Sequence, residues 1–429
     1  MSEALPAEAP SPIKRPEFRN LLAISITVAL GFGMVIPVFP LYAKSFGVSL
    51  AAVGLVQLVF GLTRFSFGLV GGLVVDRFGE RFCTMAGLLI VAASSYAAGF
   101  SVTFTQFVFA RGFGGAGSAL FIAGLHNRIL RIIEPSAMGR ATGAFRSSFL
   151  VGIGAGPLLG GIVAKNFGLA APFHFYATGL LISTVIAYIV MGSRVAPQVL
   201  VEEGGEAAPV EPPRRSPLDA LRAAKPLFRD FRFNVALLAT FVSWWTISGP
   251  GQVVAALFAE DRLDFSEDQI GLAVTLLSIG EIVVLFFAGR ASDRYGRRAV
   301  LVPSLLIGAA ATVALGQIEP WPLLYFPLAV VIGASIAAGS TASGGLMADA
   351  LPPGGSGAAV GVNQMAGDLG YLIAPISTLW LAEQAGFPIA YVFGALPAAV
   401  VFLVALRLPA RTLATHGEPA TVEPDTHVG

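Results

Sequence analysis

Charged residues are scarce in this sequence. Only 12% of its 429 residues are Asp, Glu, Lys or Arg, whereas 55% are hydrophobic. A soluble domain carries about twice that charged share. Because a soluble fold of this length could not bury so much apolar surface, we expect lipid to surround most of the chain. The composition therefore predicts a membrane protein.

Cysteine and histidine are rare as well. The single Cys83 excludes an internal disulfide framework, and four scattered His give no metal-ligand spacing, so we expect no metal. A net charge of +1 offers no general attraction for nucleic acid. Gly112, Gly114 and Gly117 match a dinucleotide fingerprint, but they lie within an apolar run with no strand before them. With no hydrolase, kinase or nucleotide-binding constellation, we expect neither an enzyme nor a nucleotide cofactor.

Long apolar runs are abundant instead. A membrane-spanning helix needs about 20 mostly apolar residues, and twelve runs meet this requirement, in two groups of six. The runs lie near 21–43, 51–75, 83–101, 105–127, 139–164, 171–192, 232–258, 268–290, 299–317, 320–346, 357–382 and 387–406. We therefore predict an all-α membrane protein with an N-terminal six-helix bundle over 20–192 and a C-terminal one over 232–407.

Lys and Arg are distributed unevenly around these runs. If both chain ends lie inside the cell, only Lys44, Lys165 and Arg262 fall in the outer segments. The positive-inside rule then predicts a multi-pass protein of the inner (plasma) membrane with cytoplasmic tails. The cytoplasmic segments would be the tails 1–19 and 408–429 and the linker 193–231, within which 218–231 suits a helix on the membrane surface.

One loop motif occurs twice, which indicates an internal duplication. The pattern G-x-x-x-D-R-x-G-x-R covers Gly72–Arg81 and again Gly289–Arg298, 217 residues later (289 minus 72). Further residues recur 218 positions apart, namely Gly143 and Gly361, Gly152 and Gly370, and Pro157 and Pro375. Such repetition predicts two homologous halves, and a substrate path between two repeated halves is a plan of secondary transporters.

On these motifs the chain resembles the major facilitator superfamily over nearly its whole length. Residues Leu30–Pro40 read L-G-x-x-x-x-I-P-V-F-P and are similar to a segment of its twelve-helix drug:proton antiporters. Residues Arg111–Gly117 resemble a second signature, with Gly114 where Gln is more usual. Residues Gly152–Gly161 match the antiporter signature in all its fixed positions, which are Gly152, Gly156, Pro157, Gly160 and Gly161. The resemblance implies two pseudo-symmetric bundles around a central cavity.

The resemblance also implies roles for these motifs. The repeated loop would latch the two halves in the outward-facing state, whereas a purely topogenic basic loop is the alternative. Its residues are Gly72, Asp76, Arg77, Gly79, Arg81, Gly289, Asp293, Arg294, Gly296 and Arg297. Glu80 replaces a commonly basic residue, so we expect a weaker N-terminal latch. The bare, Pro-kinked face of the fifth run would pivot at the interface between halves, or simply pack closely.

Five ionisable residues lie inside the expected helices, where each is costly unless it is paired or hydrated. They are Arg64, Arg111, Arg146, Glu281 and Asp368. In the family the second helix faces the eleventh and the fifth faces the eighth, which implies the pairs Arg64–Asp368 and Arg146–Glu281. We expect these ion pairs to form and break during transport and to couple it to protons; permanent structural bridges are the alternative. Three arginines against two acids favour anionic or zwitterionic substrates.

The family's cavity-lining helices imply substrate contacts as well. The candidates are Phe32, Met34, Phe39, Trp244 and Trp245, with Gln57 and Gln364 as polar orienting groups. We therefore expect a monomer in the lipid bilayer that exports small hydrophobic or amphipathic compounds, with the proton gradient as energy source and no cofactor. An uptake symporter or facilitator for a small organic solute is the alternative, and a non-transporting sensor a third possibility.

Overall fold

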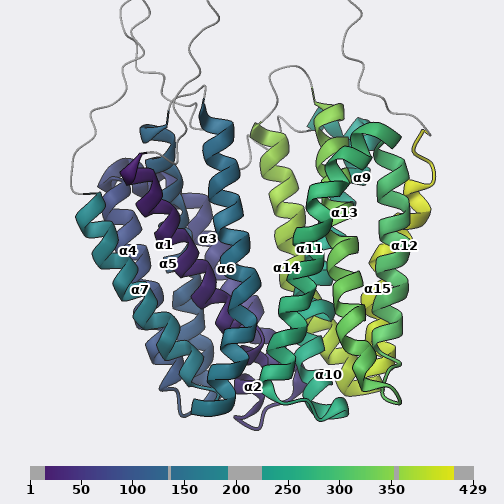
Figure 1. The fold of residues 1–429 in the computed structure, drawn as a ribbon, viewed down its shortest axis with the longest axis horizontal. Helices are drawn as coiled ribbons and strands as arrows, with labels where there is room; N and C mark the ends of the chain where they lie inside the picture. Colours follow the sequence, from purple (N-terminus) through teal and green to yellow (C-terminus); the bar gives the residue numbers. More distant parts are fainter. Residues whose placement is uncertain (1–14, 134–136, 192–224, 352–356, 410–429) are drawn as a thin grey trace, which may run out of the picture.

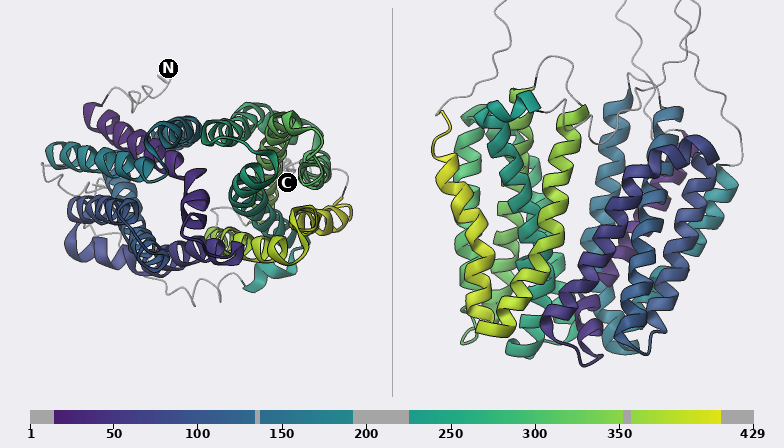
Figure 2. Two further views of the ribbon diagram at one scale, coloured as in Figure 1. Left: turned by 90° about the horizontal axis from the view of Figure 1, so that it is seen from below. Right: turned by 180° about the vertical axis from the view of Figure 1, so that it is seen from behind.

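The computed structural model describes residues 15–133, 137–191, 225–351 and 357–409. Within these ranges helices are the only regular secondary structure. They form two bundles that lie side by side (Figures 1 and 2). The fold class predicted from the sequence is therefore confirmed, while most of the predicted surface helix over 218–231 falls outside the described residues.

The helices of the N-terminal bundle are α1 (Pro16–Val35), α2 (Val38–Lys44), α3 (Leu50–Phe78), α4 (Glu80–Gly99), α5 (Phe104–Ile132), α6 (Met138–Phe167) and α7 (Ala171–Val190). Those of the C-terminal bundle are α9 (Phe231–Ser248), α10 (Val254–Leu263), α11 (Glu267–Tyr295), α12 (Arg297–Leu315), α13 (Tyr325–Ala350), α14 (Gly357–Ala385) and α15 (Phe387–Ala405). Three short turns complete the described helical segments, namely η3 (Lys225–Arg229), the π turn η4 (Gly249–Val253) and η5 (Pro322–Leu324).

Eleven of the described helices are long and apolar enough to cross a membrane. The seventh predicted run, 232–258, is the one without such a helix: it is broken into α9, η4 and α10 at Pro250. The first run is broken between α1 and α2 at Pro37. Proline lacks a backbone donor and clashes with the preceding turn, so it interrupts a helix that hydropathy alone presents as continuous. The two short pieces, α2 and α10, pack against each other across the halves.

The duplication inferred from the sequence appears in the backbone. Helices α3 and α11 have the same length of 29 residues. Both end at a glycine with positive φ, Gly79 at +84° and Gly296 at +91°. Helices α6 and α14 likewise end at Gly168 (+87°) and Gly386 (+86°). Because a Cβ is strained in this region, the repeated glycines turn the chain between helices at equivalent points of both halves.

The two halves meet along two helix pairs, α6 with α11 and α3 with α14, as the family resemblance implied. A Cβ built on Gly161 would lie 2.9 Å from Asp268 Cα, and one on Gly54 would lie 2.6 Å from Ile376 Cα. In contrast, a Cβ on Gly143 or Gly361, towards the other ends of α6 and α14, meets nothing within 4 Å. The halves are therefore tightly packed at one end only.

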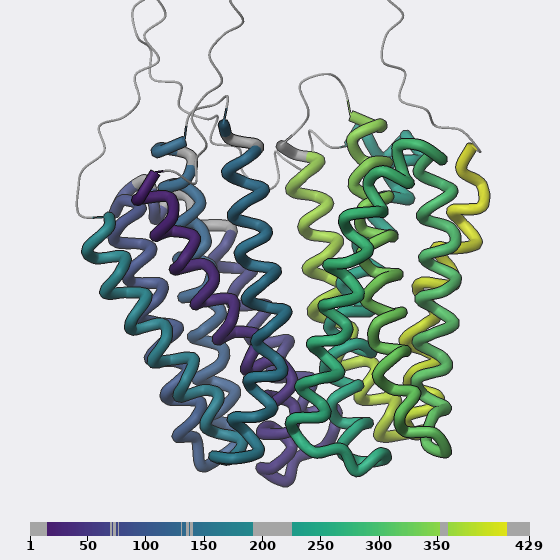
Figure 3. The backbone as a smooth tube through the Cα atoms, in the orientation of Figure 1, coloured from purple at the N-terminus to yellow at the C-terminus, as the bar shows by residue number. Residues whose placement is uncertain are grey.

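We call the packed end, which contains α2, α10 and the first residues of α3 and α11, the closed end. The opposite end, where α3 ends at Gly79 and α11 ends at Gly296, is the open end. Figure 3 shows the two sets of helices drawing apart from the closed end towards the open end. The conformation is thus one in which access between the halves is restricted to one side.

Candidate functional site

Two arginines of the N-terminal half lie on neighbouring helices, Arg64 at the middle of α3 and Arg111 about two turns into α5. Gly115 of α5 lies so close to α3 that a Cβ there would be 3.1 Å from Arg64 N and would overlap Phe60 O. This close approach brings Arg64 of α3 near Arg111 of α5. Arg111 is only 4% exposed, and its guanidinium carbon lies 4.9 Å from the centroid of the Phe60 ring, a cation–π contact.

Neither arginine is neutralised by a carboxylate at close range. Among the described residues no ion pair involves Arg64 or Arg111, and Arg111 Nε is buried without a hydrogen-bond partner. The groups within electrostatic range of both arginines are the hydroxyls of Tyr176 of α7 and Tyr371 of α14. Arg111 is a buried cation without a counter-charge, which is costly, and together with the exposed Arg64 it forms an electropositive centre.

The C-terminal half contributes polar and aromatic groups to the same region. Asp368 of α14 lies within electrostatic range of Arg64 and accepts a hydrogen bond of 3.1 Å from Gln364 Nε2. The Trp244 ring packs edge-on against that of Tyr371, with 5.9 Å between centroids. The electropositive centre is therefore surrounded by groups from both halves. Its environment changes when the two halves move relative to each other.

A small cavity of about 40 Å³ adjoins the centre and is lined by residues that include Phe32, Arg64, Ser118 and Tyr176. This volume holds water molecules, since one water needs roughly 10–15 Å³. It is far below the roughly 300 Å³ of a site for a drug-sized ligand. In this conformation the cavity has room for water beside Arg64 but not for a substrate of drug size.

The predicted cavity residues separate into two groups. Phe32 stacks on Phe60 at 6.3 Å between centroids, and Gln57 lies beside the Tyr371 hydroxyl. These two, with Trp244 and Gln364, lie at the centre. Met34, Phe39 and Trp245 are buried in this conformation, at 8%, 4% and 5% exposed, and Trp245 Nε1 donates to Gly394 O at 2.9 Å. These three side chains are used in packing here, so their contact with a substrate stays a prediction for another conformation.

The two predicted inter-domain ion pairs are not formed in this conformation. Arg64 and Asp368 are in electrostatic range without an ion pair between them. Arg146 is exposed on α6, and within the described ranges Glu281 of α11 has no ion-pair partner. The pairs remain a prediction for another conformation.

The repeated loops make their described contacts within their own halves. Arg81 donates to Tyr188 O at 3.2 Å and stacks on the Tyr188 ring, whereas Arg297 pairs with Asp293 and, at 3.2 Å, with Asp349. Arg77 and Arg294 lie over the rings of the residues that follow them. The side chain of Asp76 lies outside the described part. The predicted latch across the halves is absent from the contacts described, so its role remains a prediction.

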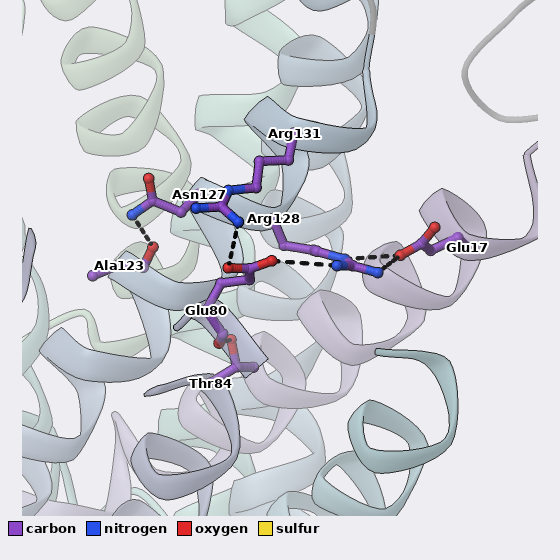
Figure 4. A network of polar contacts seen from close by, with 7 residues as sticks. All are labelled: Glu17, Glu80, Thr84, Ala123, Asn127, Arg128 and Arg131. Atoms are coloured by element: carbon purple, nitrogen blue, oxygen red, sulfur yellow. Dashed lines mark hydrogen bonds and ion pairs between the residues drawn. The ribbon is translucent and has the colours of Figure 1, made fainter. Parts of the chain in front are cut away.

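Glu80 lies in a buried network that joins three helices (Figure 4). It is 7% exposed and pairs at 3.3 Å with Arg128 and at 3.3 Å with Arg131, both on α5. Arg128, 2% exposed, also pairs with Glu17 of α1. The expectation that Glu80 merely weakens a loop contact misses this role. The residue fastens α4 to α5 and, through Arg128, to α1.

The same bridge exists in the other half with its charges exchanged. Glu80 corresponds to Arg297 at the offset of 217, and Arg131 corresponds to Asp349 at the offset of 218. The Arg297–Asp349 pair is thus the mirror, in charge, of the Glu80–Arg131 pair. The sequence could have revealed this bridge, because Glu80 and Arg297, and likewise Arg131 and Asp349, carry opposite charges at equivalent positions of the repeat.

We expect Glu80→Ala to destabilise the N-terminal bundle by about 3 kcal/mol, because it leaves Arg128 and Arg131 without their shared carboxylate. Thermal unfolding of the purified protein in detergent measures the effect. Glu319→Ala is the matched control, since Glu319 forms only a long, exposed pair with Arg262. Equal melting temperatures for both variants would contradict a structural role for the network.

The closed end is held by polar contacts between the halves that sequence analysis did not foresee. Lys44 of α2 pairs with Glu260 at 2.9 Å and with Asp261, both on α10. Lys165 of α6 pairs with Asp268 of α11 at 3.0 Å. Partial burial disfavours the charge on Lys44, but hydrogen bonds to the two acids outweigh it and raise the pKa of the ammonium. Two of the three predicted outer cations therefore join the halves.

Backbone groups take part in the same seal. Ala51 N, in the first turn of α3, donates to Glu383 of α14 at 3.1 Å, a carboxylate at a helix N-terminus. Leu158 N, directly after Pro157 of α6, donates to Thr275 Oγ1 of α11 at 3.0 Å. The antiporter-like signature of α6 thus lies at the interface between halves, where close approach of helices is needed.

Comparisons with known proteins agree with this architecture. A family model described as the Major Facilitator Superfamily matches residues 21–266 and 236–426. An uncharacterized MFS-type transporter of Methanocaldococcus jannaschii is 24% identical over 90% of this chain and 97% of its own. Multidrug resistance protein 2 of Bacillus subtilis is 25% identical over 68% of this chain and 70% of its own.

A solved structure has the same fold. It is that of a bacterial homologue of the human lysosomal transporter Spinster, in an inward-facing and unoccupied conformation. It superposes with a TM-score of 0.70 and 16% identity, covering 91% of this chain and 94% of the other. At this identity the likeness concerns the fold alone.

Proposed function

Because this chain belongs to the major facilitator superfamily, we propose that it is a proton-coupled exporter of small hydrophobic or amphipathic compounds that works by alternating access. One observation carries the proposal: two duplicated bundles are sealed across the closed end by ion pairs and by the glycine face of α6. Contacts of this kind can break and re-form without repacking either bundle.

The glycine signature of α6 supports movement at this interface. A Cβ on Gly152 would lie 2.7 Å from the Ala29 side chain of α1, and one on Gly156 would lie 2.6 Å from Gly33 Cα. On its other face, Gly161 contacts the start of α11. Helix α6 is therefore clamped between its own bundle and the partner bundle, which suits a pivot. Sequence similarity to multidrug resistance protein 2 supports export of drug-like compounds.

Proton coupling is proposed to depend on the carboxylates of Glu281 and Asp368. Both lie in membrane-spanning helices, α11 and α14, where an unpaired charge is costly. Protonation removes that cost, so each carboxylate can bind and release a proton as its surroundings change between conformations. With the positive-inside orientation, the open end faces the cytoplasm and the conformation described is inward-facing.

Transport into everted membrane vesicles tests the proposal. Vesicles from cells that produce the protein are given an acidic interior and a panel of cationic, neutral and anionic fluorescent compounds. We expect accumulation of at least one compound that stops when a protonophore is added. Vesicles without the protein are the control. Accumulation that ignores the protonophore would replace the exporter by a facilitator, and accumulation only when the vesicle exterior is the more acidic side would replace it by an uptake symporter.

A further inference from the structure

The electropositive centre between the halves has more positive charge than its surroundings neutralise. Arg64 is exposed and lines the adjoining cavity, whereas Arg111 is 4% exposed with its Nε unpartnered. The acidic group within range is Asp368, which interacts with Arg64 and is held by Gln364. For Arg111 the interacting titratable groups are the two tyrosines, Tyr176 and Tyr371. One carboxylate therefore faces two guanidinium groups, and it comes from the opposite half.

We propose that Arg64 and Arg111 bind the acidic group of an amphipathic organic anion, so that the substrates of this protein carry a carboxylate, sulfonate or phosphate. The inference rests on the proposed function and specifies its substrate class. Guanidinium groups suit such anions because their N–H donors match two oxygens at once. The hydroxyls of Tyr176 and Tyr371 lie within range of both arginines and can donate to the remaining oxygens.

Aromatic side chains beside the arginines provide the contact for the apolar part of such a compound. Phe32 and Phe60 stack in the N-terminal half, and Trp244, 40% exposed, packs on Tyr371 in the C-terminal half. Aromatic rings offer large apolar contact area at a site that also has polar groups. A charged head on the arginines and an apolar body on these rings would make contact with both bundles.

Asp368 gives the proposal a distinctive consequence. Its carboxylate is a negative group within range of Arg64, so it repels a bound anion and competes with it for the guanidinium. Neutralising Asp368 should therefore strengthen anion binding, whereas neutralising either arginine should weaken it. If the arginines had only a structural role, neutralising Asp368 and neutralising an arginine would not change anion binding in opposite directions. A membrane potential that is negative inside also favours outward movement of an anion.

Binding of three matched probes to the purified protein in lipid nanodiscs tests the inference without any gradient. The probes carry the same pyrene on a butanoate, a butylammonium or a butanol chain, and binding to empty nanodiscs is subtracted. We expect the butanoate to bind at least tenfold more tightly than the butylammonium. Arg64→Gln and Arg111→Gln should each weaken butanoate binding at least tenfold and leave butanol binding within about twofold.

Two further variants complete the design. Arg290→Gln is the matched control, because Arg290 lies near the open end of α11 and donates to Phe286 O of its own helix; it should change nothing. Asp368→Asn should tighten butanoate binding several-fold. Equal affinity of the wild type for all three probes, or a preference for the butylammonium, would overturn the proposal. If the arginine variants fail to fold, the wild type and Asp368→Asn still provide this test. Selective anion binding without proton-driven transport would instead sink only the proposed exporter.

Discussion

Replacing Glu281 with Gln is expected to abolish proton-driven transport while leaving the protein folded in the membrane. Glu281 lies in the spanning helix α11, and within the described ranges no cation pairs with it. Gly333 of α13 packs directly against this turn, since a Cβ there would be 3.2 Å from Glu281 N. Gln preserves the shape of the side chain but cannot take up or release a proton. We expect the transport rate under a proton gradient to fall at least tenfold.

The measurement must separate the loss of proton coupling from the loss of the conformational change. Exchange of labelled for unlabelled substrate at equal pH on both sides should persist in Glu281→Gln, because it needs the conformational change but no net proton flux. Asp368→Asn should likewise lose gradient-driven transport. Glu319→Gln, an acid near the closed end that pairs with Arg262, is the control. Proton-driven transport that survives in both neutral variants would remove the carboxylates from the mechanism.

Substituting Gly161 with Val is expected to prevent the closed end from sealing. A Cβ at this position overlaps Glu267 O and lies 2.9 Å from Asp268 Cα, so the obstacle is the backbone of α11 rather than a movable side chain. Overpacking costs about 1–3 kcal/mol, and a branched side chain adds to it, so the population should shift strongly towards the conformation with this end open. Transport should then fall at least tenfold.

A cysteine introduced at Thr275 reports the shift directly. Thr275 is 8% exposed and contacts Leu158 across the interface, while the native Cys83 is 1% exposed and gives little background. We expect faster labelling by a membrane-impermeant maleimide in Gly161→Val. Gly143→Ala on the same helix is the control, since nothing lies within 4 Å of a Cβ there. Slow labelling combined with normal transport would show that α6 does not need a bare face.

The sequence predicted the large features of the fold because those depend on composition and repetition. Two bundles of equal plan follow from the apolar runs and from the motif shared by Gly72–Arg81 and Gly289–Arg298. The breaks at Pro37 and Pro250 were missed because a hydropathy run measures length and apolarity but not whether its backbone bonds are continuous.

Side-chain roles were harder to predict because they depend on how each helix is rotated about its axis. Trp244 and Trp245 are neighbours in sequence, yet one faces Tyr371 and the other donates to Gly394 inside its bundle. Contacts between halves, such as Lys165 with Asp268, depend on which helix ends meet in three dimensions. Neither hydropathy nor motif spacing carries that information.

The exchanged charges of the repeat also decide which halves can associate. Lys165 corresponds to Glu383 and Ala51 corresponds to Asp268, so each half supplies one member of the two contacts Lys165–Asp268 and Glu383–Ala51. A homodimer of C-terminal halves would bring Glu383 against Asp268, two like charges, and one of N-terminal halves would leave Lys165 facing an alanine. These contacts therefore favour pairing of one half of each kind, and their fusion in one chain fixes the ratio at one to one.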